Sequence, residues 1–435
     1  MRAPARRLAD FAGQKGGRWD VLALLAILAG AAFRFLWVLL FHQPFDYVFS
    51  DMAGYVARAT RLVDGGSLER FDAFYPPGTH LLLAGVFKIF GTGHAGLWAA
   101  ATVWASLSAA TPFFMWRVAR LLLWPAAASL TAVFTALWPL HATSAGYFLS
   151  ETPSLAFLVG SLWAAYATVH AQGRRAVLLA TAAGILGGAA VTMRPQFLLN
   201  LAIVAAAWLV GTRLVRLLAA FAAGCAALIA GAVVYNSLAA GKPTGISENS
   251  GITFFIGQCD VHTVHAADGV HFTAPPAYQQ HRGRFYDFTR HQAWDQGFFF
   301  HQGLDCIRSD GWSHMRILGR DLVDLTATSV ILPQDTDPGL SEVANVSNIV
   351  YVVLLPAILI GTALIVRERR RSGSPSGELV LLLHLSAVLV PALVFFGDPR
   401  FRMPYDFFGL ALLAAVVADV LFDRGPVSAV HSPPP

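Results

Sequence analysis

Long apolar segments separated by short polar turns fill most of the chain between residues 21 and 422. A transmembrane helix needs about 20 apolar residues in a row, because the hydrocarbon core of a bilayer is about 30 Å thick. Segments near this length occur at 21–41, 95–116, 121–141, 153–171, 176–193, 195–211, 214–236, 346–366, 378–396 and 403–422. This pattern predicts an all-α polytopic membrane protein with about ten transmembrane helices.

The basic residues predict how these helices are oriented, because cytoplasmic turns carry an excess of Lys and Arg. If the N-terminus is cytoplasmic, every second turn should also be cytoplasmic and basic. The basic residues at the N-terminus, in these turns and in the tail are Arg2, Arg6, Arg7, Lys15, Arg18, Arg117, Arg120, Arg174, Arg175, Arg213, Arg216, Arg367, Arg369, Arg370, Arg371 and Arg424. We therefore predict a multi-pass protein of the inner or plasma membrane with both termini in the cytoplasm.

One apolar segment, 79–91 (THLLLAGVFKIFG), is short and carries His80 and Lys88. If it crossed the membrane, every later basic cluster would move to the wrong side. We therefore predict that it lies in the outer interface. The polar segments that then share the outer face are the loop 42–94, the turns at Glu151 and Arg194, the segment 237–345 and the turn 398–402.

The first polar loop also contains a predicted amphipathic helix. Its apolar positions follow helical spacing and are Met52, Tyr55, Val56, Ala59, Leu62 and Val63. Arg58 and Arg61, three residues apart, share the opposite face, and Gly65 with Gly66 ends the helix. Such a helix would lie in the headgroup layer with two guanidinium groups available for a phosphate.

The composition excludes a soluble protein. Of the 435 residues, 56% are hydrophobic and 13% are charged, and the mean hydropathy is +0.55. A soluble domain averages about 25% charged residues. The net charge of +5 comes from short clusters between the spans, which are topology signals and not a nucleic-acid groove. Segment 21–41 is too long for the core of a signal peptide, so we expect an uncleaved span.

These patterns divide the chain into four parts. Residues 1–236 form an N-terminal transmembrane catalytic module, and residues 237–345 form an irregular extracytoplasmic cap with a few helices. Residues 346–422 contain the C-terminal transmembrane helices. Residues 423–435, which end in HSPPP, are expected to be a disordered tail.

A series of short motifs lies in the outer segments. In chain order they are Ser50-Asp51-Met52, Tyr75-Pro76-Pro77-Gly78, Leu149-Ser150-Glu151, Thr192-Met193-Arg194-Pro195, Asn249-Ser250-Gly251, Phe255-Ile256-Gly257 and Arg400-Phe401-Arg402-Met403-Pro404. With the topology, this ordered set resembles the glycosyltransferase C superfamily, most closely the transferases related to protein O-mannosyltransferases and aminoarabinose transferases. The likeness covers most of the chain.

The resemblance implies about seven shared N-terminal spans, interfacial helices and inverting sugar transfer from a polyprenyl phosphate donor at the outer face. It also implies that Asp51 is the catalytic base. The acceptor is a glycan, lipid or protein that the resemblance does not identify, because the large soluble C-terminal domain of the relatives is lacking. Membrane lipids are expected partners and nucleic acid is not. No cofactor is predicted. The need for a divalent cation stays open, because some relatives require one and others do not.

The expected chemistry needs a carboxylate that takes a proton from the acceptor hydroxyl. Asp51 suits this role, and the alternative is a helix N-cap, which contributes about 1 kcal/mol. Glu151, beside Pro153, is either a favourable charge at a helix N-terminus or a second catalytic carboxylate that orients the acceptor or a cation.

The same chemistry needs cations that stabilise the departing phosphate. Outward-facing basic residues run against the positive-inside bias, so a specific anion would explain them. These residues are Arg58, Arg61, Lys88, Arg194, Arg400 and Arg402. Taken alone, each is better explained as a headgroup contact or an ion pair than as a phosphate ligand. Among them we favour Arg194, Arg400 and Arg402 as phosphate ligands. Tyr75 and Asn249 complete the predicted substrate-binding set.

Other polar motifs in the segment 237–345 have simpler explanations. Cys259, Asp260, His262 and His265 lack the spacing of a known zinc motif, so we predict no metal site. Asp335-Thr336-Asp337-Pro338-Gly339 contains an Asp-x-Asp motif, but its Asp-Pro-Gly sequence is typical of a turn, so we assign it no catalytic role. Cys259 and Cys306 face an oxidising compartment and either pair or stay free.

Two other function classes fit parts of the pattern. A transporter or flippase of lipid-linked sugars would use the same arginines, but transporters show paired repeats and broken helices near the bilayer midplane, which this sequence lacks. A membrane scaffold that presents the segment 237–345 leaves the cluster of outer charges unexplained.

Overall fold

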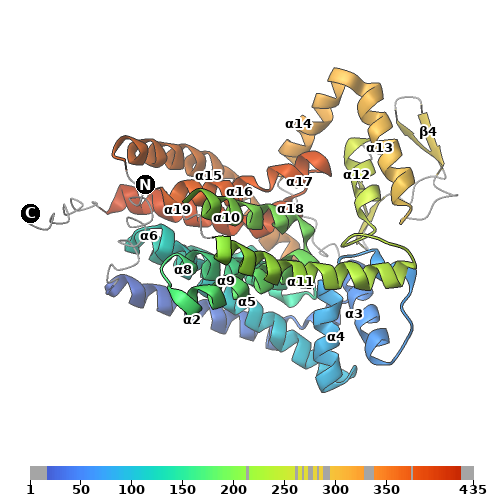
Figure 1. Cartoon of the computed structure of the whole chain (residues 1–435), viewed down its shortest axis with the longest axis horizontal. Coiled ribbons are helices and arrows are strands. Elements are labelled where there is room, and N and C mark those ends of the chain that lie inside the picture. Colours follow the sequence, from blue (N-terminus) through green and yellow to red (C-terminus); the bar gives the residue numbers. More distant parts are fainter. Residues whose placement is uncertain are drawn as a thin grey trace, which may run out of the picture.

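A computed structural model describes residues 17–211, 215–259, 263–266, 269–272, 278–281, 284–287, 294–327, 338–373 and 376–422. Long helices run side by side along the long axis of the molecule, and a smaller helical cap projects from one end (Figure 1). The start of α2 and the ends of α15 and α19 lie at the opposite end. This arrangement agrees with the alternation of turns predicted from the sequence.

The first span and the loop after it contain several short elements. They are α2 (Arg18–Leu36), a π-helical turn (Trp37–Phe41), a 3-10 turn (Pro44–Tyr47), α3 (Ser50–Val63), a 3-10 turn (Arg70–Ala73) and α4 (Gly78–Phe90). The remaining elements of the N-terminal half are α5 (His94–Leu122), α6 (Pro125–Leu137), α7 (Pro139–Thr143), α8 (Glu151–Thr168), α9 (Gly173–Met193), α10 (Leu198–Gly211) and α11 (Val215–Ala240).

The cap contains three helices and two antiparallel hairpins. These are α12 (Ser250–Gln258), β1 (Thr263–Ala266) paired with β2 (Gly269–Phe272), β3 (Tyr278–His281) paired with β4 (Arg284–Asp287), α13 (Gln296–Asp310) and α14 (Met315–Asp324). The C-terminal elements are α15 (Pro338–Arg371), α16 (Gly377–Ser386), α17 (Leu389–Val394), α18 (Pro399–Arg402) and α19 (Asp406–Leu421).

Within the described residues, seven helical segments are long and apolar enough to cross a membrane. They are Arg18–Phe41, His94–Leu122, Gly173–Met193, Val215–Ala240, Glu342–Arg371, Gly377–Val394 and Pro399–Leu421. Each coincides with a predicted span, so the prediction of an all-α multi-pass membrane protein is confirmed. The predicted number of ten spans stays a prediction.

Prolines explain why two predicted spans form shorter helices. The predicted span 121–141 is divided, because Trp138 before Pro139 adopts an extended conformation and ends α6. The predicted span 195–211 begins at Pro195 with a 3-10 turn, and its apolar helix covers Pro195–Leu209. The predicted span 153–171 coincides with α8, which has 18 residues.

Small residues allow the bundle helices to approach closely. A Cβ atom added at Gly184 of α9 would lie 2.1 Å from the carbonyl oxygen of Phe221 in α11. At Gly377, at the start of α16, an added Cβ would lie 1.9 Å from the carbonyl oxygen of Leu122 at the end of α5. Close backbone approach at small residues is typical of helix packing in membranes. The second contact joins the predicted N-terminal and C-terminal modules in one bundle.

The helix α4 contains 13 residues, which is too short to cross a bilayer. It lies steeply across the direction of the long helices (Figure 1). One side of α4 is buried, and His80 on that side lies 3.1 Å from the Tyr235 hydroxyl of α11. This arrangement fits the interfacial position predicted for the segment 79–91.

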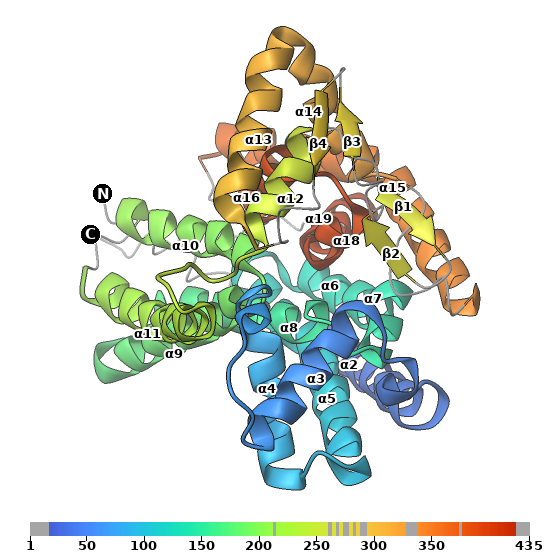
Figure 2. The same cartoon turned by 90° about the vertical axis from the view of Figure 1, so that its right-hand side faces the viewer.

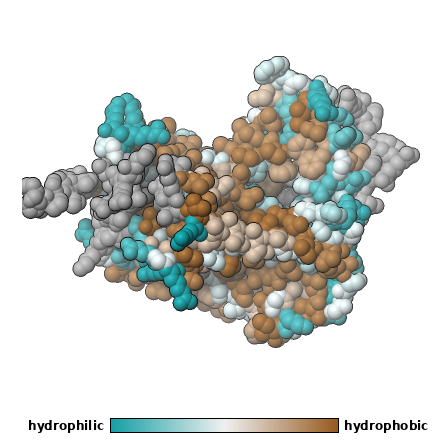
Figure 3. Space-filling view, viewed as in Figure 1, coloured by the Kyte–Doolittle hydropathy of each residue, from teal (hydrophilic) through white to brown (hydrophobic). Residues whose placement is uncertain are grey.

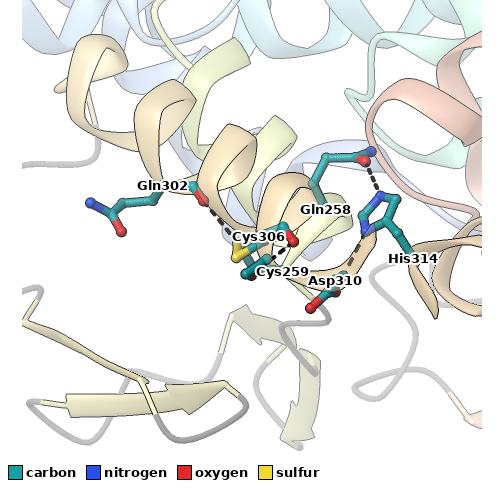
Figure 4. Close-up of a disulfide and its surroundings, with 7 residues drawn as sticks. Gln258, Cys259, Gln302, Cys306, Asp310 and His314 are labelled. Carbon is teal, nitrogen blue, oxygen red and sulfur yellow. Dashed lines mark hydrogen bonds and ion pairs between the residues drawn. A yellow bond between two sulfur atoms is a disulfide. The ribbon is translucent and has the colours of Figure 1, made fainter. Parts of the chain in front are cut away.

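A disulfide joins two cap helices, so the pairing that the sequence left open is present. Cys259 follows α12 and Cys306 lies in α13, with their Cα atoms 5.4 Å apart (Figure 4). Beside it, His314 Nε2 lies 2.8 Å from Gln258 Oε1, and the Gln258 amide donates to the carbonyls of Leu393 and Val394. These contacts attach the cap to α17.

Several sequence motifs fall outside the described residues. They include Asp260, His262, Asp335 to Asp337 and the predicted tail 423–435. Among the residues that the structure does describe, no three His, Cys, Asp or Glu side chains are grouped to hold a metal ion.

Candidate active site

A cavity of about 530 Å³ lies where four segments meet. These segments are the first loop, the α9–α10 turn, the start of α12 and the α17–α18 turn, and Leu149 and Ser150 before α8 add to the lining. Figure 2 looks onto this end of the molecule, with α3 and α4 on one side and the cap helices on the other. The cavity is therefore built from parts that are far apart in the sequence.

Asp51 lines the cavity from the first turn of α3. Its Oδ1 accepts a hydrogen bond of 2.8 Å from the Tyr75 hydroxyl, and its Oδ2 accepts one of 3.0 Å from Arg400 Nη2. The helix N-cap is Phe49, and no side chain caps α3. The alternative in which Asp51 serves as the N-cap is therefore wrong. Its carboxylate faces the cavity and not the helix end.

The residue before Asp51 has an unusual backbone. Ser50 has φ of +49°, a left-handed conformation that residues other than glycine, asparagine and aspartate seldom adopt. Ser50 also lines the cavity. Strained backbone of this kind is often found at functional sites, and here it turns the first residues of α3 toward the cavity wall.

Glu151 lies behind the cavity wall and holds two arginines that line the cavity. Arg194 Nη1 lies 2.8 Å from Glu151 Oε1, and Arg400 Nε donates to the same oxygen. The Glu151 side chain is only 2% exposed and does not line the cavity. It therefore positions the guanidinium groups of Arg194 and Arg400 and has no surface of its own for substrate.

Tyr75 connects Asp51 to an aromatic cluster in the first loop. Its ring lies 4.9 Å from the Arg58 guanidinium, and Phe71 lies on the same guanidinium at 4.6 Å. Burial and the neighbouring Asp51 carboxylate raise the pKa of the Tyr75 hydroxyl. Tyr75 therefore remains protonated at neutral pH and donates its hydrogen bond to Asp51.

Arg58 and Arg61, predicted as phosphate ligands, instead pair with Asp72. Arg58 Nε lies 3.6 Å from Asp72 Oδ1, and Arg61 Nη2 donates to the same oxygen. Arg61 also pairs with Glu69 at 2.9 Å. Neither arginine lines the cavity. Their contacts hold the first loop together.

Arg402 is also separate from the cavity. It is 4% exposed and donates to Asp406 at 2.9 Å, to the Leu325 carbonyl at 2.7 Å and to Asn348. Lys88 is exposed on α4 and does not line the cavity either. The structure therefore brings together Asp51, Tyr75, Arg194, Asn249 and Arg400, with Glu151 directly behind the arginines.

One side of the cavity is apolar and opens toward the outside of the bundle. Leu198 of α10 and Val390 and Val394 of α17 line it and are 52%, 46% and 40% exposed. α17 belongs to a candidate membrane span, and α10 lies within a shorter apolar helix. The cavity thus extends from the charged residues to the apolar side chains of these two helices.

The opposite rim is polar and comes from the segment leading into α12. Asn249 Oδ1 accepts a hydrogen bond of 2.8 Å from Ser247, and the Ser250 hydroxyl donates to Gln296 Oε1 at 2.6 Å. Both Asn249 and Ser250 line the cavity. A polar ligand group can therefore lie between this rim and Asp51.

The sequence analysis did not predict the roles of two acidic residues in this region. Asp398 lines the cavity and caps α18 by accepting from the Arg400 amide at 2.6 Å. The Asp-Pro pair at 398–399 was a readable signal of a helix start. Asp72 neutralises Arg58 and Arg61 but follows them by more than ten residues. The spacing rules for neighbours on one helix do not cover this separation.

Comparisons with known proteins add only distant similarities. No family model and no curated protein matches the chain. Among solved structures, the archaeal oligosaccharyltransferase AglB from Archaeoglobus fulgidus, in complex with an inhibitory peptide and a dolichol-phosphate, is similar. It has a TM-score of 0.47 and 15% sequence identity, covering 92% of this chain and 50% of that chain.

Two further structures of the Archaeoglobus fulgidus oligosaccharyltransferase are similar to the same extent. One, tethered to an acceptor peptide that contains the NVT sequon, has a TM-score of 0.47, 12% identity and coverages of 92% and 50%. The other, in complex with Zn and sulfate, has a TM-score of 0.46, 14% identity and coverages of 92% and 49%. The chain spans about half the length of these proteins.

Proposed function

We propose that the protein is an inverting glycosyltransferase that moves a sugar from a polyprenyl phosphate to an acceptor hydroxyl. One observation carries this proposal. A single cavity combines a carboxylate, two arginines fixed by a buried glutamate, and an apolar side lined by α10 and α17. A lipid with an anionic headgroup has the same division into charged and apolar parts.

The donor would enter between α10 and α17. Its polyprenyl chain would contact Leu198, Val390 and Val394, which line the cavity and are partly exposed. Its phosphate would bind Arg194 and Arg400, because guanidinium groups form strong charge-assisted hydrogen bonds with phosphate oxygens. The sugar would then lie beside Asp51 and the polar rim at Asn249.

In the proposed reaction, Asp51 takes the proton of the acceptor hydroxyl while the acceptor oxygen attacks the anomeric carbon. The bond between that carbon and the phosphate oxygen breaks, and polyprenyl phosphate leaves. Arg194 and Arg400 stabilise the negative charge that develops on the phosphate. Attack from the face opposite the phosphate inverts the anomeric configuration.

Arg400 links donor binding to the base. In the free protein it donates to Asp51 Oδ2 at 3.0 Å. A phosphate bound to Arg400 would therefore lie close to the Asp51 carboxylate, so one arginine would contact both the donor and the base.

We place this chemistry on the outer face of the membrane. The positive-inside pattern puts the first loop and the cap there. The disulfide between Cys259 and Cys306 supports the same placement, because disulfides persist in oxidising compartments.

The test uses membranes from cells that produce the full chain, which also supply the cell's own acceptors, with a panel of radiolabelled polyprenyl phosphate sugars. We expect release of free polyprenyl phosphate with one donor, and little release by the Asp51→Asn variant. The configuration of the product sugar tests inversion. Wild-type turnover by Asp51→Asn would refute the role of the base. Movement of intact donor across proteoliposomes without cleavage would identify a transporter instead.

A further inference from the structure

The cap helix α14 exposes an apolar stripe. Trp312, in the turn before α14, is 90% exposed, and Met315, Leu322 and Val323 are 57%, 37% and 65% exposed. Positions 312, 315, 322 and 323 lie on one face of a helix. The opposite face is buried through Ile317 and Asp321. The stripe is therefore an outward surface and not part of the cap core.

This stripe lies next to the surface that the bundle presents to lipid. An added Cβ at Gly397, just after α17, would lie 1.6 Å from the Asp321 carbonyl oxygen, so the backbones of α14 and this turn touch. In α17, Leu389 and Val390 are 43% and 46% exposed and belong to a candidate membrane span. The buried face of α14 therefore packs against the end of a candidate membrane span, and the exposed stripe lies on the other face of the same helix.

The figures show the direction of the stripe. The hairpin of α13 and α14 projects sideways beyond the long helices (Figure 1). In the space-filling view, hydrophobic surface covers the α14 region on the side that faces a hollow next to the bundle (Figure 3). A bilayer that surrounds the bundle would meet the cap on this side.

We propose that α14 and the Trp312 turn form an interfacial anchor that rests the cap on the membrane lipids. Tryptophan is enriched at the level of the lipid headgroups. Amphipathic helices with basic residues bind such interfaces through apolar burial and attraction to lipid phosphates. Arg316, exposed beside the stripe, provides such a basic group. The anchor does not depend on the proposed sugar transfer.

The anchor would also hold the cap at the opening of the cavity. α14 packs against α17, and α17 lines the cavity through Val390 and Val394. Lipid contact along α14 therefore supports the helix that borders the opening to the hydrocarbon region.

The experiment places a spin label at one position at a time in the full chain, in nanodiscs of phosphatidylethanolamine and phosphatidylglycerol. Cys225 is replaced by Ala, and the disulfide is kept. Labels replace Trp312, Met315 or Val323. The water control is Arg308, whose side chain is 74% exposed, and the lipid control is Ile360, which is 63% exposed in a candidate span.

Accessibility to oxygen, which concentrates in lipid, is compared with accessibility to a water-soluble nickel complex. We expect the oxygen-to-nickel ratio at 312, 315 and 323 to exceed that at 308 and to approach that at 360. Ratios equal to that at 308 would place the stripe in water. Labels that neither reagent reaches would indicate a protein contact, with a second copy or another partner. Either result overturns the anchor.

An unlabelled protein gives an independent measurement. Brominated phospholipids quench tryptophan fluorescence at close range, so wild type and Trp312→Phe are compared in nanodiscs with and without bromine. The difference in fluorescence between wild type and Trp312→Phe is the emission of Trp312. We expect this emission to be quenched by the brominated lipids. If this emission is unaffected by bromine, Trp312 does not contact lipid.

Discussion

Arg400→Ala and Arg402→Ala should have opposite consequences, although the two residues lie in one turn. Arg400 lines the cavity with a side chain that is 26% exposed, and it bonds to Asp51 and Glu151. Losing its charged hydrogen bond to the donor phosphate should cost about 1.5–3 kcal/mol. This corresponds to a loss of about 10- to 150-fold in donor affinity. The fold should be largely intact, because Arg194 still pairs with Glu151.

Arg402→Ala should act on stability. The substitution removes a buried ion pair with Asp406 and leaves the Leu325 carbonyl without its donor. Removing one partner of a buried pair costs about 3–5 kcal/mol, because the other charge stays buried without compensation. Donor affinity of the folded fraction should be unchanged.

The assay measures melting temperature and binding of a polyprenyl phosphate sugar for both variants in the same nanodiscs. Arg400→Lys and Arg402→Lys are the matched controls that keep a charge. A single ammonium cannot bridge Asp51 and Glu151 as a guanidinium does, so Arg400→Lys should recover only part of the affinity. The reasoning is refuted if Arg402→Ala is as stable as wild type, or if Arg400→Ala binds the donor normally.

Three further predictions test single features. Asp51→Asn should lower turnover about 10²–10⁴-fold, the usual contribution of a general base, with an unchanged melting temperature because Asp51 does not cap α3; normal turnover would contradict the base. Ser50→Gly should raise stability by about 1 kcal/mol, since glycine adopts φ of +49° without strain, and a lower melting temperature would argue against strain. Replacing both Cys259 and Cys306 by Ala should cost about 4 kcal/mol for a separation of 47 residues, which thermal unfolding with and without reductant checks.

The transmembrane helices could be predicted because length and apolarity are local properties of the sequence. The two shorter helices show the limit of that reasoning. Pro139 and Pro195 lie inside or at the edge of apolar segments, and hydropathy alone does not register that they interrupt a helix. The short strands of the cap were not predicted, because four-residue hairpin strands show no clear alternation.

The site was predicted in part, through motifs and topology together. Asp51, Arg194 and Arg400 come from three distant segments, and the structure brings them to one cavity. The arginines that do not reach it have acidic partners elsewhere in the fold. For Arg402 the partner was readable, because Asp406 follows it by four residues, the spacing of neighbours on a helix face.

The charges of the site suit the proposed reaction at every stage. In the free protein, Asp51 and Glu151 balance Arg194 and Arg400. The donor is a phosphodiester with one negative charge, and the released polyprenyl phosphate carries up to two. As this second charge develops on the phosphate, Asp51 accepts a proton and loses its own. The total charge in the cavity therefore stays constant, and in the proposed reaction Arg400, which contacts Asp51 in the free protein, binds the phosphate from donor entry onward. Because Arg400 contacts Asp51 and would also bind the donor phosphate, one guanidinium group lies between the proposed base and the phosphate on which the charge develops.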